Sequence, residues 1–156
     1  MIAGTSCATG KFFNLRRFTK SRFEEPAGGG GQLPYWFEES LLAYVRETDI
    51  IRLRQENLIS EASMRNPHTK AIFDILERGQ GELWLALSWR HYMCWFADME
   101  RRISRGHVDV RALLQQVEQH WRLLEDRDVL LEEPRNDGSW VRPWRQAFSD
   151  FRKLLG

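Results

Sequence analysis

Apolar residues recur at alternating steps of four and three in residues 34–62. This spacing places them on one side of a helix, and Pro34 suits the first turn of such a helix. The stripe consists of Phe37, Leu41, Tyr44, Thr48, Ile51, Gln55, Leu58 and Ala62. Because Thr48 and Gln55 interrupt it, the pattern favours a long helix packed inside a bundle over a dimeric coiled coil.

Two more segments of helical periodicity follow. Residues 66–79 begin with Asn66, a good N-cap, and end at Gly79, which suits a C-cap. The segment Trp84–Arg102 is the most apolar part of the chain, and its polar residues are concentrated toward its C-terminal end. We expect a short helix in the first segment and, in the second, a helix that is apolar over most of its circumference.

The last two segments complete the predicted fold. Residues 107–134 carry Asp109 as a plausible N-cap, and residues 140–155 place several aromatic residues on one helical face. No segment alternates apolar and polar residues with the period of two that is typical of a strand. The sequence therefore predicts an all-α fold for residues 33–156, a helical bundle of four to five helices.

The segment Trp84–Arg102 has three interpretations. A membrane-spanning helix needs ~20 mostly apolar residues, and the apolar part of this segment covers only residues 83–97 and includes Arg90 and His91. A metal site would use His91 and Cys94, but zinc sites take three or four protein ligands, and no further ligand stands at a recognised spacing. We therefore interpret the segment as the central core helix, and expect no membrane span.

Residues 1–32 differ in composition from the rest. Residues 1–23 contain five basic residues and no acidic one, and residues 28–31 are all glycine, which favours neither helix nor strand. We predict a disordered basic, glycine-rich tail and linker that contacts an acidic partner, lipid head groups or RNA. The alternative is an organellar transit peptide, which has a similar composition. Residues 24–156 carry 18 basic and 22 acidic residues, and this part of the chain is therefore mildly acidic.

Two cysteines, Cys7 and Cys94, do not make a disulfide framework. This favours the cytoplasm or another reducing compartment, with an organelle as the alternative if the first residues are a transit peptide. The sequence contains no Glu-x-x-His pair and no phosphate-binding glycine loop. A triad assembled only in three dimensions leaves no such spacing, but nothing here favours one. We predict a protein that is not an enzyme and holds no cofactor or metal.

The final helix is the strongest functional lead, because cations and tryptophans alternate along it. Such residues can bind an acidic protein surface, where Trp and Arg are frequent hot spots, or a nucleic acid, whose bases stack on aromatic rings. A closing helix with a charged outer face would show the same pattern. The candidate partner-binding residues, including those of the tail, are Arg16, Arg17, Lys20, Arg22, Trp140, Arg142, Trp144, Arg145 and Arg152.

The second half of the chain, roughly residues 90–155, resembles a family of small helical bacterial proteins of unknown function. The pattern of that family combines an aromatic pair, an acid, an aliphatic residue, a glycine turn and a cap, and it continues to Trp121 and "WRQAFSDF". The matching positions are Tyr92, Trp95, Phe96, Glu100, Ile103, Gly106 and Asp109. Family members often carry an N-terminal membrane anchor, which we do not expect in this chain. The resemblance implies a helical fold and no particular activity.

Together these patterns predict a non-enzymatic helical interaction or accessory module that docks on a larger protein partner. The alternative is an accessory protein that binds nucleic acid with its basic tail and its C-terminal Arg/Trp helix. Neither the identity of the partner nor the oligomeric state follows from the sequence.

Overall fold

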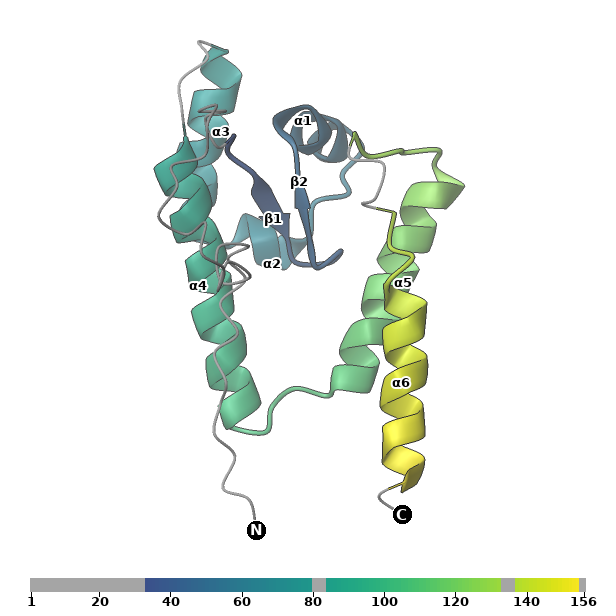
Figure 1. The fold of residues 1–156 in the computed structure, drawn as a ribbon. Helices are drawn as coiled ribbons and strands as arrows, with labels where there is room; N and C mark the ends of the chain where they lie inside the picture. Colours follow the sequence, from purple (N-terminus) through teal and green to yellow (C-terminus); the bar gives the residue numbers. More distant parts are fainter. Residues whose placement is uncertain (1–32, 80–83, 133–136, 155–156) are drawn as a thin grey trace, which may run out of the picture. The chain divides into compact units, whose positions relative to one another are not determined.

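The computed structural model describes residues 33–79, 84–132 and 137–154. All of them belong to residues 32–156, the second of the two units into which the chain divides. The predicted tail of residues 1–32 lies outside the described residues. Two strands and six helices occur within them (Figure 1). They are β1 (Trp36–Glu38), β2 (Ala43–Val45), α1 (Glu47–Gln55), α2 (Glu61–Met64), α3 (Thr69–Arg78), α4 (Leu85–Ser104), α5 (Val110–Asp126) and α6 (Val141–Leu154).

The mostly helical character predicted from the sequence is confirmed, but the chain is not all-α. Residues 34–62 do not form one long helix. They form the antiparallel hairpin β1–β2, with Trp36 opposite Val45 and Glu38 opposite Ala43, followed by the short helices α1 and α2. Ile51, which the predicted stripe buries, is exposed.

The hairpin was not predicted from the sequence, because its strands show no alternation of apolar and polar residues. All three residues of β1 are buried, including the carboxylate of Glu38, so both faces of this strand are covered. The strands have three residues each, and the turn between them contains Leu42 at a positive φ of 48°. A bulky residue is rare in this conformation, which glycine and asparagine usually adopt. The turn therefore carried no recognisable signal.

Capping residues predicted the later helices better. The Asp109 carboxylate accepts hydrogen bonds from the backbone N–H groups of Arg111 and Ala112, as an N-cap should. Gly79 ends α3 in the left-handed conformation. Asn66 is not the N-cap of α3; its side chain accepts a hydrogen bond from the backbone of His68, two residues later, where the cap position lies.

The helix α4 does not have the surroundings predicted for it. Only Ser88, His91, Tyr92 and Met99 are buried along its length. Met93 and Ile103 are exposed, and α4 packs against β1 and α3 with one face. The prediction that this segment is the central core helix is therefore wrong. The small hairpin occupies the position in the core that the sequence analysis gave to α4.

The hydrophobic core of the domain lies around the hairpin. Trp36 of β1 and Val45 of β2 are fully buried, and side chains from α1, α3, α5 and α6 pack in the same cluster. The buried residues that these helices contribute include Ile50, Leu53, Ile72, Phe73, Val117, Trp121, Leu124 and Val141. The Trp36 ring stacks on Phe73, with 5.3 Å between the ring centroids. Burial of large aromatic side chains contributes strongly to stability, so the hairpin is the hydrophobic centre of the domain.

Glu38 connects the hairpin to the helices through hydrogen bonds. One carboxylate oxygen accepts from the Trp36 indole at 3.1 Å. The other accepts from the backbone and hydroxyl of Ser40 at 3.2 and 2.9 Å and from the backbone of Ser60 at 3.1 Å. Four donors therefore surround a side chain that solvent does not reach. A buried carboxylate is tolerated only with partners of this kind.

We expect Glu38→Gln to destabilise the fold by about 3 kcal/mol, because the amide nitrogen cannot accept the hydrogen bonds that one carboxylate oxygen accepts. Urea unfolding followed by circular dichroism measures the change. Glu61→Gln is the matched control, since the Glu61 side chain is 92% exposed. Equal stability of the two variants would show that the buried hydrogen bonds contribute little.

Gly138, just before α6, has a positive φ of 72°, and a Cβ atom there would lie under 3 Å from ring atoms of Trp121. We expect Gly138→Ala to cost at least ~3 kcal/mol, from backbone strain and overlap with Trp121 together. Gly79→Ala provides the comparison, because Gly79 has a similar φ of 60° but nothing within 4 Å of its Cβ position. That variant should lose only about 1 kcal/mol. Thermal unfolding of both proteins tests whether the contact with Trp121 accounts for the difference.

Candidate functional site

A groove of about 580 Å³ lies between α5 and α6, two helices that run side by side (Figure 1). Leu114 of α5 is buried and Phe148 of α6 is half-buried, and both contribute apolar surface to it. The remaining lining residues are polar or charged: Arg111, Glu118, Arg142, Arg145, Gln146, Ser149 and Lys153. The groove thus combines apolar surface with four cations and one carboxylate.

The charges of the groove are only partly compensated. Glu118 is largely buried and forms ion pairs with Arg145 across the groove and with Arg122 on its own helix. Lys153 pairs with Asp150 at 3.2 Å. Arg111 and Arg142 are exposed, and neither has an ion-pair partner among the residues that the structure describes. Two uncompensated guanidinium groups, one from each helix, therefore line the same groove.

The predicted cations and tryptophans of the final helix do not lie together in one site. Arg142 and Arg145 line the groove, whereas Trp144 does not. Successive helix residues are rotated by about 100°, so Trp144 lies about 200° from Arg142 around α6. Trp140 is half-buried against the core. The side chain of Arg152 and the tail residues Arg16, Arg17, Lys20 and Arg22 lie outside the described part of the chain.

Trp144 belongs to an exposed apolar stripe instead. Its side chain is 64% exposed. Phe151, seven residues later and so on the same side of α6, is exposed too, as is Leu154 at the end of the helix. The sequence predicted that aromatic residues of this segment share one helical face; Trp144 and Phe151 do so, but that face is not buried. Contiguous exposed apolar surface is characteristic of contact sites.

Arg111 was missed by the sequence analysis, although it completes the groove. It lies seven residues before Glu118, and this spacing places both side chains on the same face of α5. No prediction of how α5 and α6 pack followed from the sequence. The faces by which they meet were not evident from either helix alone. Arg111 could therefore not be recognised as part of a site.

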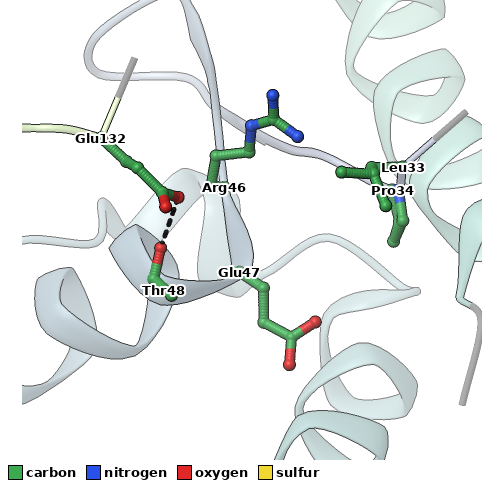
Figure 2. A pocket seen from close by; sticks show the side chains of 6 residues that line it. All are labelled: Leu33, Pro34, Arg46, Glu47, Thr48 and Glu132. Carbon is green, nitrogen blue, oxygen red and sulfur yellow. Dashed lines mark hydrogen bonds between the residues drawn. The ribbon is translucent and has the colours of Figure 1, made fainter. Parts of the chain in front are cut away.

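A second pocket, of about 470 Å³, lies at the start of α1 (Figure 2). Its charged groups already have partners. The Thr48 hydroxyl donates a 2.8 Å hydrogen bond to the Glu132 carboxylate, drawn in Figure 2. Glu47 accepts from the Trp84 indole at 3.4 Å, and the Arg46 guanidinium lies 4.6 Å from the centre of the Tyr35 ring. We interpret this pocket as a structural junction.

The same junction fixes the chain after α5. The backbone N–H of Glu132 donates to both carboxylate oxygens of the buried Asp49, at 3.1 Å each. Farther back, the Arg127 guanidinium donates to the backbone carbonyl of Glu56 at 2.9 Å. These contacts hold residues 127–132 against α1 and so position the connection that leads to α6 and its groove.

His91 is buried and lies against Trp36, with 4.1 Å between the ring centroids. Both ring nitrogens are inaccessible to solvent and lack a hydrogen-bond partner. The pKa of His91 is lowered from 6.5 to about 4, mainly by burial and also by nearby His68, while the Ser63 carbonyl acts in the opposite direction. Among the described residues, no three His, Cys, Asp or Glu side chains are placed to hold a metal ion.

Comparison of the chain with protein-family models, curated proteins and solved structures gave no match. The resemblance of the second half to small helical bacterial proteins therefore stays a prediction. None of the helices in the described ranges has both the length and the apolar character needed to cross a membrane.

We expect the depressed pKa of His91 to make stability fall as the pH drops from 6.5 towards 4. In this interval the unfolded chain binds a proton at His91 and the folded chain does not, so protonation favours unfolding. The full effect is about 3 kcal/mol. Urea unfolding across this range should show a weaker pH dependence for His91→Gln than for the native sequence.

His107→Gln is the matched control, because it replaces an exposed histidine in the same way. Nuclear magnetic resonance of the imidazole carbons gives a direct measurement. At about pH 5 the His91 ring should still be neutral while an exposed ring is charged. Titration of His91 at the value of an exposed histidine would contradict the assignment.

Proposed function

We propose that the chain is a non-enzymatic interaction module that binds an acidic segment of a larger protein partner in the α5–α6 groove. The observation that carries this proposal is the pair Arg111 and Arg142. The two guanidinium groups come from different helices, lack ion-pair partners among the described residues, and line one groove with an apolar floor.

The chemistry of the groove favours carboxylates. A guanidinium group binds a carboxylate through two parallel hydrogen bonds, which combine strength with a defined geometry. Two such groups suit a segment that carries two acidic side chains. Leu114 and Phe148 offer apolar contact for a side chain between them. Arg145 stays paired with Glu118, so we assign it a role in positioning the groove.

A protein partner is favoured over nucleic acid by the positions of the aromatic residues: Trp144 does not line the groove, and Phe148, which does, is half-buried. Single-stranded nucleic acid is bound by cations that hold the backbone beside aromatic rings that stack with the bases. Trp144, the exposed tryptophan of α6, lies on a different side of the helix from Arg142. We propose that Trp144, Phe151 and Leu154 form a second, apolar contact with the same partner. The basic tail, with Arg16, Arg17, Lys20 and Arg22, would add contacts to an acidic protein.

The groove can be tested with a labelled peptide of about 12 residues in which Glu and Leu alternate, measured by fluorescence anisotropy at low salt. We expect Arg111→Glu combined with Arg142→Glu to weaken binding by at least ~30-fold, because two attractive contacts become repulsive. Arg90→Glu combined with Arg105→Glu is the matched control. It changes the net charge equally at exposed positions outside the groove, and should weaken binding less than ~3-fold.

The same variants then serve in affinity purification from the protein's own host. A partner that is retained by the native chain and by the control, but lost with the groove variant, supports the proposal. Equal loss with both variants would mean that only net charge matters, and the groove would be rejected. Binding of oligouridylate that decreases steeply with salt and depends on Trp144 would favour the nucleic-acid alternative instead.

A further inference from the structure

The two helices that form the groove run in opposite directions (Figure 1). Two contacts fix how they are aligned. Glu118 of α5 forms an ion pair with Arg145 of α6. One turn farther along α5, the Trp121 ring lies against Gly138, which comes just before α6. Residue numbers therefore rise along one helix where they fall along the other, and each residue that lines the groove has a defined position along its length.

The two uncompensated arginines lie toward opposite ends of the groove. Relative to the Glu118–Arg145 pair, Arg111 lies seven residues toward the start of α5, and Arg142 lies three residues toward the start of α6. Since a helix rises about 1.5 Å per residue, these displacements are about 10 Å and about 5 Å. Because the helices are antiparallel, the displacements have opposite directions and add. The backbone positions of Arg111 and Arg142 are therefore about 15 Å apart along the groove.

The apolar residues of the groove lie between these two arginines. Leu114 comes three residues after Arg111, and Phe148 comes six residues after Arg142, so both are displaced toward the middle. The carboxylate of Glu118 also lines the groove between its ends, and it would repel an acidic group placed there. The groove thus presents a cation, an apolar surface and a second cation in sequence along its length.

We infer that the groove binds an extended segment in which two acidic residues stand four positions apart, with an apolar residue midway between them. Side chains at alternate positions of an extended chain face the same side, and four residues span about 13 Å. Spacings of two or six residues span about 7 Å or about 20 Å and match the two arginines less well. This inference rests on the proposed function, because it requires that Arg111 and Arg142 bind acidic side chains.

The size of the groove favours an extended segment over a helix. A helix would need about eleven residues to place two acidic side chains this far apart on one face. A volume of about 580 Å³ suits a ligand with a few side chains, as an acidic, an apolar and a second acidic residue provide. The extended segment is therefore the occupant to test first.

Labelled peptides of one composition test the order of the side chains by fluorescence anisotropy at low salt. A peptide with the core Glu-Ser-Leu-Ser-Glu should bind at least ~5-fold more tightly than one with Glu-Leu-Ser-Ser-Glu, whose leucine faces away from Leu114 and Phe148. Moving one glutamate so that the two acids stand two or six positions apart should also weaken binding at least ~5-fold, because one charge contact is lost.

Single substitutions then show which arginine each glutamate contacts. In Arg111→Gln, replacing one peptide glutamate by glutamine should change the affinity less than ~2-fold, while replacing the other should still weaken binding about tenfold. The two glutamates should exchange these roles in Arg142→Gln. Arg90→Gln is the matched control, since Arg90 is exposed and lies outside the groove. In that variant both glutamates should still contribute.

The inference is overturned if peptides bind through Arg111 and Arg142 but show no preference for a spacing of four residues. It is also overturned if a helical peptide with its acids eleven positions apart binds more tightly than the extended one. In both cases the groove would remain a binding site for acidic segments. If no peptide binds in a way that depends on these two arginines, the proposed function is rejected together with the inference.

Discussion

Glu38 is a carboxylate without solvent contact, and the geometry of the domain depends on the donors around it. It joins the hairpin to the loop between α1 and α2, because Trp36, Ser40 and Ser60 all donate to it. These hydrogen bonds fix the position of the hairpin relative to that loop. The Trp36 ring then supports His91 from one side, and Phe37 supports Trp95. The side chains of α4 that contact the hairpin therefore depend on the hydrogen bonds of a buried carboxylate in the neighbouring strand.

Trp121 connects the hairpin to the two helices that form the groove. The Trp121 indole donates a 3.1 Å hydrogen bond to the backbone carbonyl of Leu41, in the hairpin turn. Gly138 lets the chain pass close to the Trp121 ring just before α6 begins. The positions of α5 and α6 thus depend on one tryptophan, which touches the hairpin on one side and the entrance to α6 on the other. This packing of α5 and α6 brings Arg111 and Arg142 to the same groove.

The sequence predicted those parts of the molecule that depend on local interactions. Asp109 and Gly79 indicated where helices begin and end, since capping involves residues close in sequence. The hairpin could not be predicted in this way. The burial of Glu38 depends on Ser60, 22 residues away, and the residues of β1 have no polar face. The groove was half predicted: Arg142 and Arg145 were named, but Arg111 and the separation of Trp144 required the packing of α5 against α6.

The apolar stripe of Trp144, Phe151 and Leu154 has a consequence for the life of the protein in the cell. Exposed apolar surface of this kind promotes aggregation and is tolerated best when another molecule covers it. Under the proposed function, a copy of the chain without a bound partner displays the stripe to chaperones and proteases, which continuously sort such molecules. The amount of this protein would then follow the amount of its partner, and surplus chains would be short-lived.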